Sequence, residues 1–154
     1  MSIQPSRFEQ GRAMLLAGTR QYHLFATAHS TITQQWQRFK QHHLYTSQHS
    51  PKSFGATCMA DANGFEYMCA VEVDSFEHLA PDIGRMIIKP QYYAIFAHQG
   101  DIATIGQTWQ DVHQWIATSD YHHEHAPCFE LYDQRYNPQA SSGLVEIWIA
   151  IKQP

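Results

Sequence analysis

The sequence predicts an α+β fold in which a βαββ module is duplicated around a pseudo-two-fold axis. Two observations lead to this prediction: a short helical motif occurs twice, and β-prone runs flank both copies in the same order. The chain of 154 residues is long enough for one compact domain with a core but short for two. We therefore expect a single domain over residues 1–154, with internal repeats at about 20–74 and 91–152.

The helical motif reads TITQQWQRF at residues 31–39 and TIGQTWQDV at residues 104–112. Thr, Ile, Gln, Trp and Gln recur in register. Apolar residues in both copies follow the spacing of an amphipathic helix that packs on a sheet: Ile32, Trp36 and Phe39 in the first, Ile105, Trp109, Val112 and Ile116 in the second. We interpret Trp36 and Trp109 as core residues in preference to ligand contacts, because large apolar residues at this spacing usually pack inward.

The segments around the two helices also repeat. QYHLFA precedes the first helix and QYYAIFA the second, while SFGATC and CFELYD follow them. GFEYMCAVEV and LVEIWIAIK then close the two halves. Each half therefore has the order strand, helix, strand, strand, and joining the two sheets into one antiparallel sheet buries both helix stripes. The segment DSFEHLAPDIGRMIIKPQ, with two prolines and one glycine, is predicted to connect the halves.

The two copies differ in the strand that follows the helix. Aligning Phe54 with Phe129 places Gly55 at the position of Glu130, so only the second copy carries a carboxylate there. Strand alternation predicts that Phe129 and Leu131 share one face, beneath the helices. Glu130 is then expected on the opposite face.

Tyr132 and Trp148 are expected on the same face as Glu130, which surrounds a carboxylate with aromatic rings. If this face lines a groove between the halves, a lipophilic cation gains charge pairing and cation–π contact there. In the alternative interpretation the face is solvated, and Glu130 pairs with Arg135 or Lys152. The periodicity of the strands leaves both interpretations open.

Composition and charge argue against several classes of function. The net charge of −4 and the lack of a Lys/Arg-rich run disfavour direct nucleic-acid binding. No apolar run approaches the roughly 18 residues that cross a bilayer, and the N-terminal MSIQPSRFEQ lacks the apolar core of a secretory signal, so we expect a cytoplasmic protein without membrane contact. Cys58, Cys69 and Cys128 have no CxxC spacing and are expected to be buried thiols.

Four segments in order, YYAIFAHQG, TIGQTWQDVHQWIATSDY, PCFELYDQRYNP and VEIWIAIK, together with the upstream GFEYMCAVEV, resemble the AraC-type effector-binding domain, also called the GyrI-like small-molecule-binding domain. The likeness covers nearly the whole chain and is weakest before Tyr22. It implies duplicated βαββ (SHS2-like) modules with a central groove for cationic or aromatic compounds. It also implies that the glutamate of the motif F-E-x-Y, here Glu130, is the counter-charge of the ligand.

The resemblance further implies groove positions for aromatic side chains. The matching residues are Tyr93, Phe96, Trp115 and Trp148, and pseudo-symmetry adds Tyr22 and Tyr67. Whether Tyr92 or Tyr93 faces the groove stays open, because a shift of one residue in strand register exchanges the two faces. The chain shows no helix-turn-helix segment, so the resemblance points to a stand-alone binding protein that sequesters or senses its ligand.

The loop YHHEHAP brings His122, His123 and His125 next to Glu124, a set of residue types that could bind a transition metal. Adjacent histidines converge on one ion only in a pre-shaped loop, so we favour a solvated loop and expect neither a metal nor another cofactor.

Three functions remain open. A small molecule, cationic or aromatic, binds in the groove beside Glu130. Alternatively, Glu130 is the general base of a hydrolase, with Tyr93 or Tyr132 orienting a reactive substrate. In the third, the chain is a protein-interaction module whose partner is a transcription regulator or DNA gyrase.

Overall fold

The computed structural model describes residues 3–48 and 50–152 of the chain. Within these residues the chain forms one antiparallel sheet and two long helices, α1 (Ala28–Phe39) and α3 (Ile105–Thr118). A single helical turn, α2 (His43–Thr46), follows α1, and the short 3-10 helix η1 (Ile102–Thr104) leads into α3. No helix in the described residues is long and apolar enough to cross a membrane.

The strands of the sheet follow the predicted β-prone runs and add several others. In chain order they are β1 (Arg7–Gly11), β2 (Met14–Leu24), β3 (Ser53–Ala60), β4 (Gly64–Val73), β5 (Gly84–Ile88), β6 (Gln91–Asp101), β7 (His122–His123), β8 (Cys128–Tyr132), β9 (Tyr136–Asn137) and β10 (Ser142–Lys152). The segment predicted to be a connection therefore contains β5. The N-terminal strand β1 lies before the region where the repeat is visible in the sequence.

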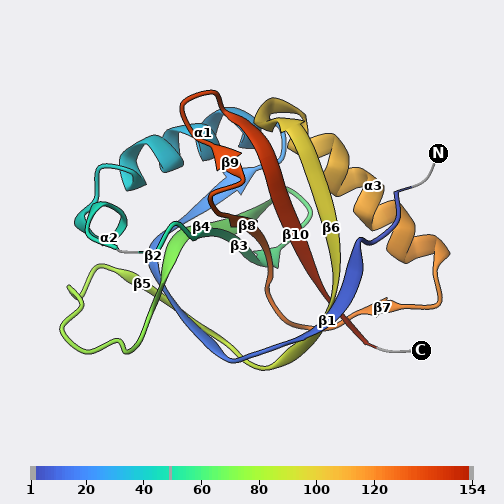
Figure 1. Ribbon diagram of the computed structural model, residues 1–154, viewed down its shortest axis with the longest axis horizontal. Helices are drawn as coiled ribbons and strands as arrows, with labels where there is room; N and C mark the ends of the chain where they lie inside the picture. Colours follow the sequence, from blue (N-terminus) through green and yellow to red (C-terminus); the bar gives the residue numbers. More distant parts are fainter. Residues whose placement is uncertain (1–2, 49, 153–154) are drawn as a thin grey trace.

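The order of strands in the sheet is β1-β6-β10-β8-β3-β4-β2-β5, so β1 and β5 are the two edges. Only residues 12 and 13 link β1 to β2, and only residues 89 and 90 link β5 to β6. In a flat sheet, each link would have to span six strand spacings, about 29 Å. Two residues reach at most about 11 Å between the strand ends. The sheet must therefore curl until its edges approach each other. In Figure 1 both links appear at the lower edge of the molecule.

The two halves of the chain occupy equivalent places in this sheet. In the first, β2, α1, β3 and β4 follow one another, and in the second β6, α3, β8 and β10 do so. The leading strand of each half pairs with the other half, β1 with β6 and β5 with β2. At the centre, β3 pairs antiparallel with β8, and Gly55 lies opposite Glu130. The predicted α+β fold of duplicated βαββ modules with pseudo-two-fold symmetry is confirmed.

Both long helices cover the face of the sheet that carries Glu130, which we call the outer face. Trp36 and Phe39 of α1 pack against Tyr67 and Cys69 of β4, and Cys69 lies opposite Gly55 in the sheet. The other face, which we call the inner face, carries Phe129 and Leu131 and faces the inside of the curl. The prediction that Phe129 and Leu131 lie beneath the helices is therefore wrong, because alternation separates two faces without telling which one a helix covers.

Candidate functional site

A cavity of about 1520 Å³ opens on the outer face, between α1 and α3. Residues of both helices form its sides, and residues of β3, β4, β8 and β10 form its floor. Each helix contributes its Trp, Trp36 from α1 and Trp109 from α3, so the duplicated motif faces the cavity from both sides. The two helices thus flank the central strands on which Glu130 lies (Figure 1).

Glu130 lies at the floor of the cavity with only 5% of its surface exposed. Its Oε1 accepts hydrogen bonds from the hydroxyls of Tyr67 and Tyr132, both at 2.7 Å. Its Oε2 accepts a hydrogen bond from the indole nitrogen of Trp109 at 2.8 Å. The predicted site residues Glu130, Tyr67 and Tyr132 therefore come together in one cluster. Strands β4 and β8 and helix α3 build it.

The first half of the chain supplies the support for this cluster. The indole nitrogen of Trp36 donates to the hydroxyl oxygen of Tyr67 at 3.0 Å, which leaves the hydroxyl hydrogen for Glu130. Gly55 provides the space. A Cβ atom at this position would lie 1.9 Å from the Tyr67 hydroxyl and 2.8 Å from Oε1 of Glu130. The residue that corresponds to Glu130 by pseudo-symmetry is thus a glycine because one carboxylate fills the centre for both halves.

The carboxylate of Glu130 forms no ion pair with the part of the chain that the structure describes. Burial raises the pKa of Glu130 above its ordinary value, and hydrogen bonds from Trp109, Tyr67 and Tyr132 oppose that rise. Burial and the nearby carboxylate raise the pKa of Tyr67 and Tyr132 well above the ordinary range, so both stay protonated donors. The solvated interpretation, in which Glu130 pairs with Arg135 or Lys152, is wrong.

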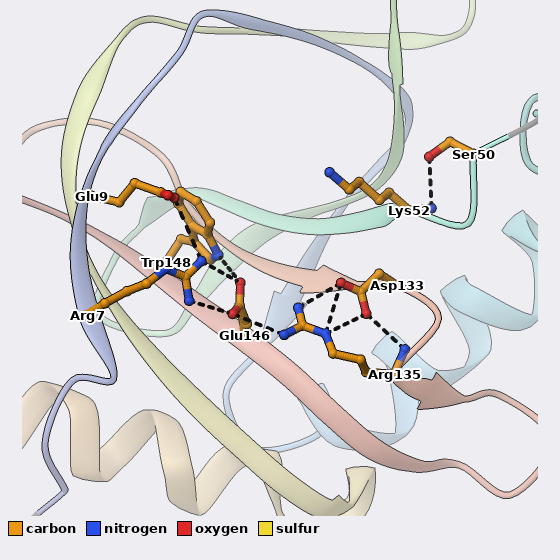
Figure 2. A network of polar contacts seen from close by, with 8 residues as sticks. All are labelled: Arg7, Glu9, Ser50, Lys52, Asp133, Arg135, Glu146 and Trp148. Carbon is orange, nitrogen blue, oxygen red and sulfur yellow. Dashed lines mark hydrogen bonds and ion pairs between the residues drawn. The ribbon is translucent and has the colours of Figure 1, made fainter.

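Arg135 instead belongs to a network on the inner face, shown in Figure 2. It pairs with Asp133 at 2.7 Å and reaches Glu146 at 3.5 Å. Glu146 also pairs with Arg7 of β1 at 2.8 Å and accepts a hydrogen bond from the indole of Trp148 at 3.0 Å. The guanidinium of Arg7 lies over the Trp148 ring, 5.6 Å from its centroid.

The structure separates the other predicted site residues from the cavity. Tyr93 and Trp148 pack on Phe129 at the inner face, with ring centroids 5.5 and 5.3 Å from it. The expected sharing of one face by Glu130 and Trp148 is wrong, because Trp148 lies opposite Phe129 in the ladder and cross-strand register is not visible in one strand alone. Phe96 and Trp115 pack on each other between β6 and α3, 5.2 Å apart.

Tyr22 lies farther out on β2 and donates a hydrogen bond to Asp61 at 2.7 Å. It lines a separate hollow of about 200 Å³. Of the two adjacent tyrosines of β6, Tyr93 lies on the inner face and Tyr92 stacks on Phe8 of β1, with ring centroids 6.0 Å apart. Neither of them lines the main cavity.

Sequence reasoning passed over Trp36 and Trp109 as ligand contacts. Both do pack against the core, as expected, but both also line the cavity and hydrogen-bond into the Glu130 cluster. The signal that could have found them is the repeat itself. Both copies carry a tryptophan at the same position of the helix, and only one copy carries the carboxylate. This combination indicates a single site to which both halves contribute.

The histidine loop forms the rim of the cavity on the α3 side. His123 pairs with β10 as part of β7, and its ring lies 5.7 Å from that of His113 in α3. His123, Glu124 and His125 line the cavity. Across the described residues, no group of three or more metal-ligating side chains is placed to hold an ion. Cys69 and Cys128 are buried free thiols, and the side chain of Cys58 lies outside the described residues.

A curled sheet of two βαββ halves with a cavity between its helices is the architecture of a small-molecule-binding domain. The chain belongs to the GyrI-like small molecule binding domain family, which matches residues 4–152.

Individual relatives agree with this assignment. The transcriptional regulator BrlR of Pseudomonas aeruginosa is 29% identical over 125 residues, which cover 79% of this chain and 46% of BrlR. The chain thus spans less than half the length of that relative. Among solved structures, SAV2435 bound to tetraphenylphosphonium has a TM-score of 0.78 at 22% identity, covering 95% of this chain and 93% of SAV2435. An integron cassette protein of Vibrio cholerae has a TM-score of 0.73 at 17% identity, covering 98% of both chains.

Proposed function

We propose that the chain binds a lipophilic organic cation in the cavity between α1 and α3, with the carboxylate of Glu130 as the counter-charge. One observation carries this proposal. A carboxylate that is 5% exposed accepts hydrogen bonds from three neutral donors and has no ion-pair partner among the described residues. A buried charge without a partner is costly, and a ligand of opposite sign removes much of that cost.

The walls of the cavity suit the apolar part of such a ligand. Trp36 and Trp109 face it from the two helices, and Tyr67 and Tyr132 border the carboxylate. Aromatic faces attract cations and also provide large apolar contact areas. SAV2435, which has the same fold, is bound to tetraphenylphosphonium in its structure, and this supports the choice of probe.

The geometry favours binding over hydrolysis. Oε1 of Glu130 already accepts two hydrogen bonds and Oε2 accepts one. A general base needs a free lone pair within hydrogen-bond distance of the proton it removes, and here three of about four lone-pair sites are occupied. The relation to the transcriptional regulator BrlR supports a role in sensing the ligand.

The test is a titration of the full chain with tetraphenylphosphonium chloride, followed through tryptophan fluorescence. We expect saturable quenching, because Trp36 and Trp109 line the cavity. Glu130→Gln removes the charge but keeps the size of the side chain. At an effective dielectric of about 20, an ion pair 5–6 Å apart contributes up to about 3 kcal/mol, so we expect the affinity to fall by roughly 10- to 100-fold.

Glu146→Gln is the matched control. It neutralises the other buried glutamate, which is also 5% exposed but lies on the inner face of the sheet. This variant should bind the cation as the wild type does. An affinity of Glu130→Gln close to that of the wild type contradicts the assignment of Glu130 as counter-charge.

A further inference from the structure

The two halves of the cavity can be compared position by position, because the helical motif keeps its register. Three pairs of cavity-lining residues are identical in α1 and α3: Ile32 and Ile105, Trp36 and Trp109, Gln37 and Gln110. In the same register, Lys40 at the end of α1 corresponds to His113 in α3, and both line the cavity. The two helices thus share the aromatic and amide groups that line the cavity, and they differ at the position of Lys40 and His113.

Lys40 brings a positive charge to the α1 side. Among the described residues that line the cavity it is the one lysine or arginine. Its side chain is half-buried and forms no hydrogen bond or ion pair with any described residue. Arg38, two positions earlier, is exposed and donates to Gln21 at 2.6 Å, so a cation of α1 that points elsewhere does find a partner.

A position at the helix C-terminus by itself stabilises a lysine, because the helix dipole is negative at that end. This explains why a cation is tolerated there. It does not supply a counter-charge, since the dipole carries only about half a charge and lies within the protein. The ammonium group therefore remains available to a ligand in the cavity.

Three acidic residues line the cavity: Glu130 at the floor, Glu124 at the rim, and Asp133, which pairs with Arg135. Lys40 at the α1 side is of opposite sign and forms no ion pair with Glu130. The volume of the cavity, about 1520 Å³, is larger than that of most sites for a single drug-sized molecule.

On the α3 side, burial lowers the pKa of His113, and burial together with the charge of His113 lowers that of His123. The α3 side thus presents the rings of His113 and His123 together with the acidic Glu124, and it offers no lysine or arginine among the described lining residues.

We propose that the preferred ligand is a zwitterion with an aromatic body, whose cationic centre lies at Glu130 and whose carboxylate or other acidic group lies at Lys40. This inference rests on the proposed function, since it keeps Glu130 as the counter-charge of the cation, and it adds a second, oppositely charged anchor. The aromatic body lies along Trp36 and Trp109 between the two anchors.

Rhodamine B and its ethyl ester are a matched pair of probes. The dyes share the cationic xanthylium body, and only rhodamine B also carries a free carboxylate. Each dye is titrated with the full chain at neutral pH, and binding is followed by fluorescence anisotropy. We expect rhodamine B to bind more tightly than the ester. Lys40→Gln should weaken the binding of rhodamine B by roughly fivefold or more and leave the ester nearly unchanged.

Two further variants separate charge from structure. Lys40→Arg keeps the positive charge and should retain the preference for rhodamine B. Lys89→Gln removes one exposed lysine from the link between β5 and β6 and should bind both dyes as the wild type does. Equal weakening of both dyes in Lys40→Gln, or no weakening of either, overturns the inference.

The failure of this inference can be told apart from the failure of the proposed function. If the ester binds and depends on Glu130 while Lys40→Gln has no effect on rhodamine B, cation binding stands and the zwitterion is overturned. If tetraphenylphosphonium binds the wild type and neither dye does, the inference alone is overturned. If none of the three compounds binds, the proposed function fails and the inference fails with it.

Discussion

The two buried glutamates of the central sheet differ in what surrounds them. Glu130 and Glu146 lie on neighbouring strands, each 5% exposed, and they point to opposite faces. On the inner face, Arg7 and Arg135 neutralise Glu146 (Figure 2). On the outer face, the described residues that hydrogen-bond to Glu130 are neutral donors, two tyrosine hydroxyls and one indole.

The pKa values of the two side chains reflect this difference. Burial raises the pKa of both carboxyls, but hydrogen bonds and ion pairs with Arg7, together with the Trp148 indole and Arg135, bring that of Glu146 below its ordinary value. The pKa of Glu130 stays above its ordinary value. A buried carboxylate with arginine partners in its own chain is part of the fold. A buried carboxylate without one agrees with the proposed role of Glu130 as the counter-charge of a cationic ligand.

The largest effect is expected from a substitution that fills the space beside Glu130. In Gly55→Ala the new Cβ would lie 1.9 Å from the hydroxyl of Tyr67, a side chain that is 1% exposed and held from both sides. Overpacking and the loss of a hydrogen bond to a charged group should together lower the free energy of unfolding by about 3 kcal/mol. Urea unfolding measures this change, and the affinity for tetraphenylphosphonium should fall as well.

Gly106→Ala is the control for that substitution. Gly106 also lines the cavity, but nothing lies within 4 Å of a Cβ built there, and its place in α3 favours alanine. This variant should be more stable than the wild type by about 0.5–1 kcal/mol. Wild-type stability in Gly55→Ala contradicts the role given to Gly55.

A smaller effect is expected on the inner face. Glu146→Gln loses the ion pairs with Arg7 and Arg135, and because Arg7 is 43% exposed the expected loss of stability is moderate, about 2 kcal/mol. The folded protein holds the pKa of Glu146 below that of the unfolded chain, so the unfolded chain binds more protons as the pH falls. The advantage of the wild type over Glu146→Gln is therefore present above the ordinary glutamate pKa and shrinks as the pH falls below it.

Urea unfolding of both proteins at several pH values measures this dependence. An advantage that stays constant, or grows on acidification, contradicts the assignment of Glu146 as a paired structural carboxylate.

The fold could be predicted from the sequence because the βαββ unit occurs in it twice. The matched helical motifs set the two halves, and the Phe54–Phe129 alignment placed Gly55 and Glu130 at equivalent positions, which pair with each other in the sheet. Strand β1 was not predicted, since it finds its partner β6 only through the curl of the sheet. Long-range pairing of this kind leaves no local pattern.

The candidate site was predicted only in part. Glu130, Tyr67 and Tyr132 line the cavity, while Tyr93 and Trp148 lie on the inner face. Their placement depends on strand register, and one residue of shift moves a side chain to the opposite face. Trp36 and Trp109 were predicted to be core residues, and they also line the cavity. Helical spacing does not distinguish these two cases, because an apolar residue that also lines a cavity has the same spacing as one that only packs in the core.

The central claim is that the chain leaves Glu130 without a counter-charge and that a cation supplies it. The most direct measurement is an NMR titration of the Glu130 side-chain carboxyl, carbon-13 labelled, with and without saturating tetraphenylphosphonium. We expect a midpoint above that of an ordinary glutamate in the free protein and a lower midpoint with the cation bound, so that binding weakens as the pH falls through the free value. A midpoint that the cation does not move contradicts this account.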